Sequence, residues 1–384
     1  MTSNSDDTLD ATETATPPTR LTLRDGGWLL VVSGVLVLAV AIWGLAGVFT
    51  GSSTIGDGVD PSTYGFTLEP SDLRGGILTG SGNPRDFLAA LDTPRRAPAA
   101  EVPEINRRQR GKFLVSTDRV IGVALGGEAR AYPLRVMNAH EIVNDELGGV
   151  PIAVTYSPLA DSVVVFDRRI LRPYSTNRLA TFAVSGLVFE SNLVLYDRAG
   201  EGESSLWSQI GARPIAGPAL AGGESLVVLA GVQLLTWAQW SAMHPATEVI
   251  LPDPRAIRRY KEFDFRRYWL GGTPMFPLGR ALHGQTSGQT SGQTSGERSG
   301  DAPPWAPMTR LIVLTHHGAT RVLTFEEISK AAEPGEVWAF DLNGAAITLT
   351  VDRPLETVRV DSDRPVVVIH TRAFAWHATR DASE

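Results

Sequence analysis

Short runs in which apolar residues predominate recur along most of the chain, and Gly-rich or Pro-rich turns separate them. These runs cover residues 118–125, 129–134, 150–156, 162–167, 179–186, 191–197 and 226–235. Runs of this length with turn signals between them predict β-strands in mostly antiparallel sheets. Helical periodicity is confined to residues 133–147, 236–245 and 325–332. The pattern predicts a β-rich α+β fold.

Two segments of the chain repeat one order of landmarks, because residues 119–137 align with 310–328 and residues 147–165 align with 342–360. Each copy predicts a strand, a Gly turn, a strand, a short helix, a Gly turn, a strand, a Pro turn and a strand. Chance similarity between strand-rich segments is the alternative to duplication. A single copy would expose strand edges and an open sheet face, so we expect the two related repeats to pair with each other. The aligned landmarks are Gly127 with Gly318, Arg130 with Arg321, Leu134 with Phe325 and, after a one-residue insertion, Pro158 with Pro354.

Residues 28–49 form an uncharged apolar segment that predicts a transmembrane helix. A helix of that length spans about 33 Å, which is enough to cross a bilayer core of roughly 30 Å. A buried core helix is the first alternative, but this segment is apolar on every face. A cleaved signal peptide is the second, but it needs a shorter apolar region followed by a cleavage site. We therefore expect an uncleaved anchor whose partner is the lipid bilayer.

The distribution of basic residues predicts the orientation of this anchor. Arg20 and Arg24 precede the apolar segment, and the next basic residue after it is Arg74. Since positively charged flanks stay on the cytoplasmic side, residues 1–27 are expected to form a disordered cytoplasmic tail. The main domain is then expected outside the cytoplasm, attached to the cell membrane.

Composition divides the remainder of the chain. Residues 50–71 are rich in Gly, Ser, Thr and Pro and are expected to be a linker. Residues 283–304 contain the repeated tetrapeptide GQTS, which is typical of a flexible linker. Residues 72–282 are expected to contain the first β-rich repeat. Residues 305–379 are expected to contain a second, shorter repeat that completes the same domain.

Charge and cysteine content exclude several classes of function. The net charge of −7 and the isoelectric point near 5.6 give no basic surface for nucleic acid. The chain contains no cysteine, which excludes disulfides, thiolate catalysis, iron–sulfur ligation and thiolate zinc sites. No H-E-x-x-H or G-x-S-x-G motif is present. We expect no cofactor.

The candidate ligand-site residues lie before, within and after the Pro turn at residues 157–160. On a helix, His140 and Asn144 would share one face, and Glu141 and Asp145 would share the next. Two carboxylates in that relation repel by a few tenths of a kcal/mol, so a cation or an arginine is expected beside them, or the last turn is not helical. Alternatively, Asp145 caps the following Gly turn. The local arginine candidates are Arg130, Arg135 and Arg168, and the other candidate site residues are Tyr156, Ser157, Asp161, Ser162, Trp207 and Gln209.

Trp207 and the histidines of the second repeat allow two interpretations each. Trp207, followed by small polar residues, could stack on a ligand, or it could be a half-buried aromatic residue whose indole N–H is satisfied. His316 and His317 are adjacent on a predicted strand, so they point to opposite faces and cannot both bind one ion.

The segment GGEARAYPLRVMNAHEIVNDELGGVPIAVTYSPLADSVVVFDRR, together with FAVSGLVFESNLVLYDR and SLWSQIGARPIAGPALAG, resembles the bacterial and archaeal family known as domain of unknown function 3179. The resemblance covers residues 73–252, with a weaker continuation over 305–378. It brings no established activity. It implies that the turn usually reads Cys-Pro-Leu-Cys, sometimes with selenocysteine, near the histidine of HEIVND, and that glycine usually stands at position 161.

If the resemblance holds, Ser157 and Ala160 occupy the two sulfur positions in this chain. A Cys-x-x-Cys turn acts by closing a disulfide or by clamping a metal. Serine cannot form a disulfide and binds soft metals poorly, and alanine offers no reactive atom. The redox or metal chemistry that the resemblance suggests is therefore expected to be lost.

Three hypotheses for the function remain. In the first, the chain is a membrane-tethered, non-catalytic binding or scaffold protein that keeps the fold and a ligand cleft. In the second, it is a weak hydrolase with Ser157 as nucleophile, His140 as base and Asp145 as the residue that orients the base. In the third, His140, Glu141, Asp145 and Asp161 bind a hard cation through oxygen and imidazole ligands. We favour the first, in which the chain is not an enzyme.

Overall fold

The structure is a computed structural model that describes residues 32–38, 54–108, 112–173, 175–200, 202–253, 265–279, 305–332, 336–377 and 379. It has two units, residues 1–54 and residues 55–384. In the first unit, residues 32–38 are helical. The rest of the expected transmembrane segment, the expected tail 1–27 and the expected linker 283–304 lie outside the described residues. Among the described residues, no helix is both long and apolar enough to cross a bilayer.

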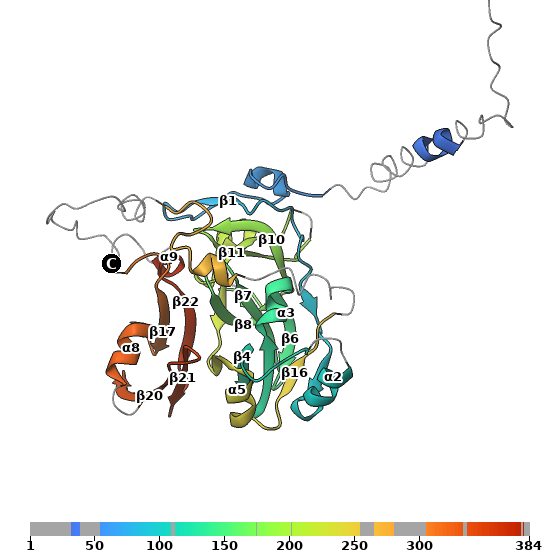
Figure 1. Cartoon of the computed structure of the whole chain (residues 1–384). Coiled ribbons are helices and arrows are strands. Elements are labelled where there is room, and N and C mark those ends of the chain that lie inside the picture. The colour runs from blue at the N-terminus through green and yellow to red at the C-terminus, as the bar shows by residue number, and fades with distance from the viewer. Residues whose placement is uncertain are drawn as a thin grey trace, which may run out of the picture. The chain divides into compact units, whose positions relative to one another are not determined.

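Within its described residues, the second unit contains four sheets, of which the largest has nine strands. Strands β17, β22, β8, β7 and β6 of this largest sheet are labelled in Figure 1. Its pairs are antiparallel except for β2 with β6. Two further strands, β14 (Ser225–Val228) and β9 (Arg178–Leu179), pair with β8. The main order is β18 (Ala319–Thr324), β17 (Arg310–His316), β22 (Val367–Arg372), β8 (Ser162–Leu171), β7 (Val150–Ser157), β6 (Ile142–Leu147) and β2 (Leu91–Asp92).

A five-stranded sheet lies against one face of the nine-stranded sheet, and helix α5 (Trp237–Met243) packs on it. A capping box between Thr236 and Gln239 begins this helix. Trp240 packs so closely on Gly122 that a Cβ atom there would lie 2.2 Å from the indole ring, so this strand position needs glycine. The order is β15 (Val232–Thr236), β4 (Arg119–Leu125), β5 (Glu128–Pro133), β16 (Glu248–Ile250) and β3 (Arg96–Pro98).

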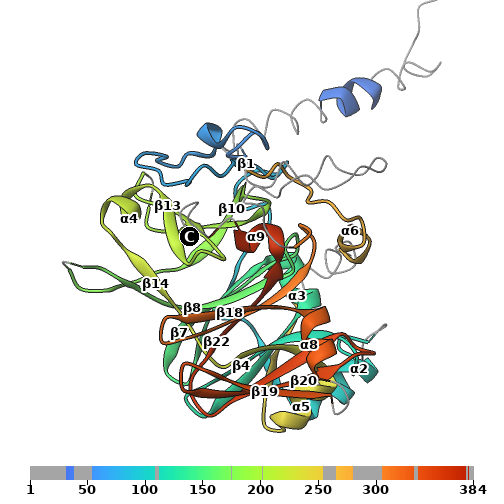
Figure 2. The ribbon, with the colours of Figure 1, turned by 90° about the vertical axis from the view of Figure 1, so that its left-hand side faces the viewer.

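A second five-stranded sheet packs on the opposite face of the nine-stranded sheet, through an apolar core that contains Phe166, Phe182 and Trp207. Figure 2 shows its strands β10 and β13 at the end of the unit opposite to β19 and β20. Its order is β1 (Leu78–Gly80), β10 (Phe182–Phe189), β11 (Asn192–Asp197), β12 (Leu206–Ser208) and β13 (Arg213–Ala216).

The fourth sheet has three antiparallel strands, β19 (Val337–Leu342), β20 (Ala345–Asp352) and β21 (Thr357–Ser362). Together with β17, β22 and α8 it encloses a separate apolar core. The remaining helices are η2 (Pro61–Tyr64), η3 (Ala99–Glu101), α2 (Val102–Arg108), α3 (Leu134–His140), α4 (Pro218–Ala221), α6 (Arg266–Trp269), α8 (Phe325–Ala331) and α9 (Ala373–His377).

The prediction of a β-rich fold with mostly antiparallel sheets is confirmed. The two aligned segments also have one order of elements, β4-β5-α3-β6-β7-β8 in the first and β17-β18-α8-β19-β20-β21 in the second. In each case a later strand, followed by a helix, pairs with the first strand of the segment. Strand β22 follows β21 directly and precedes α9, whereas β15, which precedes α5, comes only after β9 to β14 and α4. The similarity between the segments therefore extends beyond the part that the sequence alignment covers.

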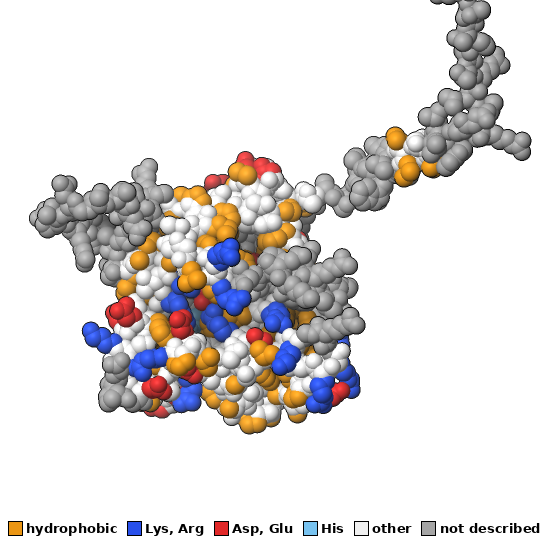
Figure 3. Space-filling model, in the orientation of Figure 1, with side chains coloured by type: hydrophobic (Ala, Val, Ile, Leu, Met, Phe, Trp, Pro, Cys, Tyr) orange, Lys and Arg blue, Asp and Glu red, His pale blue; other side chains and the backbone are white. Residues whose placement is uncertain are grey.

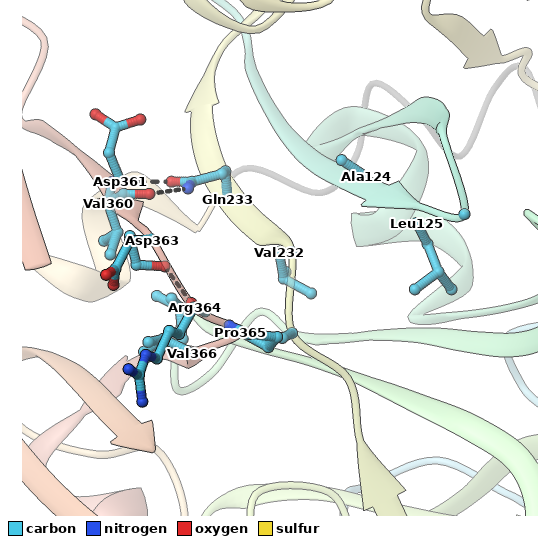
Figure 4. A pocket seen from close by; sticks show the side chains of 15 residues that line it. Ala124, Leu125, Val232, Gln233, Val360, Asp361, Asp363, Arg364, Pro365 and Val366 are labelled. Carbon is cyan, nitrogen blue, oxygen red and sulfur yellow. Dashed lines mark hydrogen bonds between the residues drawn. The ribbon is translucent and has the colours of Figure 1, made fainter. Parts of the chain in front are cut away.

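The two segments exchange these additional strands. Strand β22 pairs with β17 of its own segment and also with β8 of the other segment, at His370 and Val163. Strand β15 pairs with β4 and lies against β21 of the other segment. There the Gln233 amide donates to the Val360 carbonyl at 2.5 Å and accepts from the Val360 N–H at 3.2 Å, as Figure 4 shows. The side chain thus takes the place of a ladder hydrogen bond between the segments.

Three predicted boundaries require correction. The predicted helix 133–147 is wrong beyond residue 140, because Glu141 adopts a left-handed conformation with φ of 57° and Ile142–Leu147 is strand β6. The predicted strand 226–235 is two strands separated at Gly231, where a Cβ atom would lie 2.3 Å from the Ala124 carbonyl oxygen. Part of the expected linker 50–71 packs against a core, since Tyr64 and Phe66 are buried beside sheet residues.

Candidate functional site

Alternation along β7 and β8 divides the candidate residues between the two faces of the nine-stranded sheet. Ile152, Val154 and Tyr156 point to the core beneath the β4–β5 sheet, whereas Ala153 points to the core beneath β10 and β11. Successive side chains of a strand lie on opposite faces, so Tyr156 and Ser157 must point apart. Candidate residues that are neighbours in sequence therefore belong to separate clusters.

Ser157 borders a cavity of about 170 Å³ between β7, β10 and β11. Most of its lining is apolar, and Ser157, Asn138 and Glu141 lie on its α3–β7 side. Within the described residues no hydrogen bond to the Ser157 hydroxyl is found, although the residue itself is buried. Leu159 of the Pro turn also lines the cavity without filling it. The remaining lining residues are Ser81, Asn83, Phe87, Leu88, Val184, Gly186, Leu187, Val188, Leu193, Phe265, Met275 and Phe276.

Residues 265–279 cover the cavity and are held by contacts with the turns beneath them. The Trp269 indole N–H donates to the Pro158 carbonyl at 2.8 Å, which fixes this cover to the Pro turn itself. The Gly279 N–H donates to the Glu190 carboxylate at 2.7 Å. Phe276, which lines the cavity, donates its N–H to Ser191 Oγ at 3.3 Å. Segments distant in the sequence thus enclose Ser157.

Glu141 presents a carboxyl group to this apolar cavity. Its left-handed backbone ends α3, with its N–H donating to the Met137 carbonyl at 2.7 Å and its carbonyl accepting from the Tyr156 N–H at 2.8 Å. Burial raises the pKa of Glu141 to about 8. Although Glu141 keeps partial exposure, neighbouring protein atoms displace water from its carboxyl group, and the described residues form no salt bridge with it, which favours the neutral form. At neutral pH this side chain is therefore mainly a protonated carboxylic acid that can donate a hydrogen bond.

His140, the last residue of α3, is buried and oriented by the backbone. Its Nδ1 lies 2.6 Å from the Ala89 carbonyl oxygen. A carbonyl only accepts, so the proton must be on Nδ1, and in the neutral imidazole Nε2 carries the lone pair. In a catalytic triad, the acidic residue accepts the hydrogen bond from the Nδ1 atom of the histidine. In this chain a backbone carbonyl takes that place.

Asp145 lies on the other face of the sheet and is bound to Arg130. The Arg130 guanidinium donates to the buried Asp145 carboxylate at 2.7 Å, and the Tyr132 hydroxyl donates to it at 2.9 Å. Of the three arginines that the sequence offered as partners, Arg130 makes this salt bridge. Asp145 accepts from the Glu146 N–H at 2.8 Å, so its cap is local and does not reach the Gly turn. Asp145 therefore does not orient His140.

Asn144 and Trp207 have structural hydrogen bonds. The Asn144 amide donates to the Phe182 carbonyl at 2.9 Å and accepts from the Phe182 N–H at 3.0 Å, which joins β6 to β10. Trp207 is fully buried, and its indole N–H donates to Asp197 at 3.1 Å. The interpretation of Trp207 as an aromatic residue with a satisfied N–H fits this geometry, although the side chain is buried more completely than expected.

Ser162 and Gln209 form a third buried cluster, between β8 and the β10–β11 sheet. The Ser162 hydroxyl donates to Gln209 Oε1 at 2.6 Å, and Gln209 Nε2 donates to Thr155 Oγ1 at 3.2 Å. Gln209 Nε2 also donates to the Ser162 carbonyl at 3.1 Å. These polar groups satisfy one another, as buried polar groups must. The cluster holds two sheets together.

Asp161 belongs to a cluster of arginines on the face of Tyr156. Arg119 donates to both Asp161 carboxylate oxygens at 3.1 Å, and the Tyr156 hydroxyl donates at 2.8 Å. Arg372 lies 3.8 Å away. Burial by itself raises the pKa of Asp161, but Arg119, Arg372 and Arg310 outweigh burial and lower it. The carboxylate stays ionised within a positively charged environment.

The four residues expected to bind a cation do not meet. Asp145 and Asp161 form salt bridges with different arginines, and His140 faces the Ala89 carbonyl. Over the described ranges, no group of three or more His, Asp and Glu side chains is placed to hold a metal ion. The geometry brings together Ser157 and Glu141 from the candidate list and separates them from Asp145 and Asp161.

A family model described as "Protein of unknown function (DUF3179)" matches residues 86–382. The chain belongs to the DUF3179 family. It matches no curated protein and no solved structure. The DUF3179 match includes both aligned segments, the Ser157 turn and the cover at residues 265–279.

Sequence reasoning missed two groups of residues in this DUF3179 chain. The first is the apolar lining of the cavity, such as Phe87, Val184 and Phe276, which gives no signal beyond ordinary hydrophobicity. The second is the arginine cluster of Arg119 and Arg310 around Asp161. A signal for the second existed, because these arginines are the first residues of the aligned segments 119–137 and 310–328.

Proposed function

We propose that this DUF3179 protein is a non-catalytic binding protein, anchored to the cell membrane through residues 28–49, with its main domain outside the cytoplasm. Its ligand is a small, mainly apolar molecule with one hydrogen-bond acceptor, such as a carbonyl or ether oxygen. The observation that carries the proposal is the cavity beside Ser157, into which Glu141 presents an uncharged carboxylic acid. The anchor and its orientation rest on the uncharged segment and on the arginines before it.

The lining of the cavity supports an apolar ligand. Ligand pockets are typically lined by hydrophobic and aromatic side chains with a few polar groups that fix orientation. The cavity of about 170 Å³ has this composition. An apolar cavity of about 150 Å³ in a protein is known to bind benzene, so a single six-membered ring is a suitable size of ligand.

The polar groups define how such a ligand would be oriented. A protonated Glu141 carboxyl group is a strong hydrogen-bond donor, and the described residues provide it with no acceptor. A hydrogen-bond acceptor on the ligand would pair with this carboxyl group, and no charge would have to be buried when the ligand binds. Ser157 can contribute a second hydrogen bond from the adjacent strand.

Two features argue against catalysis at this turn. Within the described residues, no acidic–basic pair is placed to activate the Ser157 hydroxyl, because Asp145 is bound to Arg130 on the other face of the sheet. Ala160, at the second sulfur position that the family resemblance implies, is fully buried in the apolar core. The fold and the cavity remain, whereas the turn contains no sulfur atom, and its Ser157 hydroxyl has no acidic–basic pair beside it among the described residues.

A ligand-observed NMR experiment on the purified full chain tests the proposal. Cyclohexanone and tetrahydropyran are the acceptor probes, and cyclohexane-sized hydrocarbons without an acceptor are the comparison. We expect saturable binding of the acceptor probes that Leu159→Trp abolishes, because this substitution fills the cavity. Leu270→Trp is the matched control, since Leu270 is 89% exposed. Equal binding to both variants, or no binding to the wild-type chain, would contradict the proposal.

A further inference from the structure

Arg119 and Arg310 occupy equivalent positions in the two aligned segments and have equivalent acidic partners. Arg119 binds Asp161 at 3.1 Å, and Arg310 binds Glu356 at 3.0 Å. Asp161 and Glu356 each end the Pro turn of their own segment in a left-handed conformation, with φ of 47° and 50°. The similarity between the segments therefore includes a salt bridge from the first strand to the last turn.

The two arginines line one small cavity at the junction of the segments. Its volume is about 10 Å³, which is enough for one water-sized body. Leu234 of β15 and His370 of β22 also line it, and these two residues have equivalent registers, opposite Ile121 and Ile312 respectively. The remaining lining residues are Asp161, Leu311, Ile312, Phe325 and Thr371.

Among the described residues, the positive charge around this cavity exceeds the negative charge. Arg119, Arg310 and Arg372 contribute three positive charges, of which Asp161 neutralises one. Glu356, the second acidic partner, has a side chain that is 69% exposed, so water screens most of its effect. Burial lowers the pKa of Arg310, and the neighbouring Arg119 lowers it further. The Arg119, Arg310 and Arg372 side chains are 24%, 26% and 10% exposed, so these like charges lie together with only partial access to water, which favours a counter-charge between them.

Buried polar nitrogen atoms that have no hydrogen-bond partner among the described residues are present in the same region. His370 is 5% exposed, and its Nε2 has no hydrogen-bond partner among the described residues. Arg372 Nε, beside Asp161, also has none within the described part of the chain. Buried donors of this kind normally have a partner in the protein or in a bound species. Figure 3 shows Lys and Arg side chains gathered across the middle of the face drawn there, with Asp and Glu among them.

Burial lowers the pKa of His370 to about 3, and Arg310 and Arg119 contribute to the shift. The imidazole is therefore neutral, with one N–H to donate. A water molecule could accept that hydrogen bond, but it would leave the charge of the arginines uncompensated. An anion would compensate the charge, and in so small a cavity a monatomic halide needs less room than tetrahedral sulfate or phosphate.

We propose that the cavity between Arg119, Arg310 and His370 binds a monatomic anion, with chloride as its physiological occupant. The anion accepts hydrogen bonds from the two guanidinium groups and from the imidazole N–H. It joins the first strands of the two segments at the place where β22 crosses from one segment to the other. This site is separate from the Ser157 cavity, and its occupation does not depend on the proposed ligand.

Thermal unfolding of the purified full chain tests the site in solution. Sodium chloride and sodium bromide are titrated against sodium gluconate and sodium sulfate at matched ionic strength. We expect chloride and bromide to raise Tm in a saturable manner, as a ligand that binds only the folded state must. His370→Leu, which copies the equivalent Leu234, should weaken the apparent halide affinity about tenfold or more, because one hydrogen bond to a charged group is lost.

Arg107→Gln is the matched control for salt effects at the surface, because the Arg107 side chain is 71% exposed. It should keep the halide response of the wild-type chain. Anomalous diffraction from wild-type crystals grown with bromide gives a second readout. It requires no substitution, so misfolding of a variant cannot affect it. A peak between Arg119, Arg310 and His370 supports the site. Ordered water without an anomalous signal there, or an identical response to all four salts, overturns the proposal.

Discussion

Tyr156 and Ser157 are consecutive in strand β7, yet their side chains serve opposite faces of the nine-stranded sheet. The Tyr156 hydroxyl donates to Asp161 at 2.8 Å in the arginine cluster, whereas Ser157 borders the cavity that Glu141 shares. This is the period-two geometry of a strand, applied to a sheet that is buried on both sides. Two sites with different chemistry thus lie back to back across one strand.

The pH dependence of stability should reveal Glu141. Its pKa is about 8 in the folded chain and near the ordinary value of 4.5 in the unfolded chain. Between these values the folded state binds a proton that the unfolded state has lost, so the free energy of unfolding should fall as pH rises, by at most about 1.4 kcal/mol per pH unit. Urea unfolding across this range measures the slope.

Glu141→Gln is the comparison for that slope, because the amide has a similar shape and does not titrate. The variant should lose the contribution of this residue and should be more stable than the wild-type chain near pH 8, where the native carboxyl group begins to ionise. Parallel stability curves for the two chains would show that Glu141 titrates normally.

Arg130 and Asp145 should behave as a buried pair whose members depend on each other. The Arg130 and Asp145 side chains are 2% and 1% exposed. Arg130→Met leaves a buried carboxylate with Tyr132 and a distant Arg96 as its remaining side-chain partners, and we expect a loss of about 3–5 kcal/mol in the free energy of unfolding. Adding Asp145→Leu should restore much of this loss, since both charges are then removed. Urea unfolding of the single and double variants forms the thermodynamic cycle, and additive losses would contradict the coupling.

The Ser157 hydroxyl should be unreactive. A serine-reactive fluorophosphonate should not label the wild-type chain at this residue, because no acid–base pair activates the hydroxyl. Ser157→Ala should change the free energy of unfolding by less than about 1 kcal/mol, since no hydrogen bond to the hydroxyl is found among the described residues. Peptide mass spectrometry locates any label. A label on Ser157 in the wild-type chain that the variant lacks would show that the turn is a nucleophilic centre.

Local patterns in the sequence predicted most strands of the first segment because the nine-stranded sheet is buried on both faces. Runs such as 150–156 and 162–167 are mainly apolar for this reason, and they agree with β7 to within one residue and with the start of β8, which extends four residues beyond the predicted end. The error at residues 141–147 has a specific cause. Glu141 reverses the backbone in a conformation that is uncommon for a residue with a side chain, so the periodicity of α3 gave no sign of its end.

The candidate site could be predicted only in part, because its residues come from distant segments. HEIVND and the Pro turn led to Glu141 and Ser157, which do share a cavity. The cover at residues 265–279 and the strand β10 could not be assigned to the cavity, since hydrophobic pattern does not specify which surfaces meet. For the same reason, the sequence did not predict that Arg119, Arg310 and Arg372 come together, since they lie on three different strands.

Gln233 should be essential to the junction between the two segments. Its amide takes the place of a strand backbone by donating to the Val360 carbonyl and accepting from the Val360 N–H (Figure 4). Gln233→Ala removes both hydrogen bonds and should cost about 1–3 kcal/mol in the free energy of unfolding, because two peptide groups lose their partners. Hydrogen exchange gives the local readout, and the Val360 amide should exchange faster in the variant, whereas the Gly122 amide on β4 should not.

Gln233→Glu is the matched variant, since it keeps the acceptor for the Val360 N–H but loses the donor for the carbonyl. It should therefore retain amide protection at Val360 better than alanine does. Unchanged exchange in Gln233→Ala would show that contacts between the apolar cores, and not this side chain, hold β15 against β21.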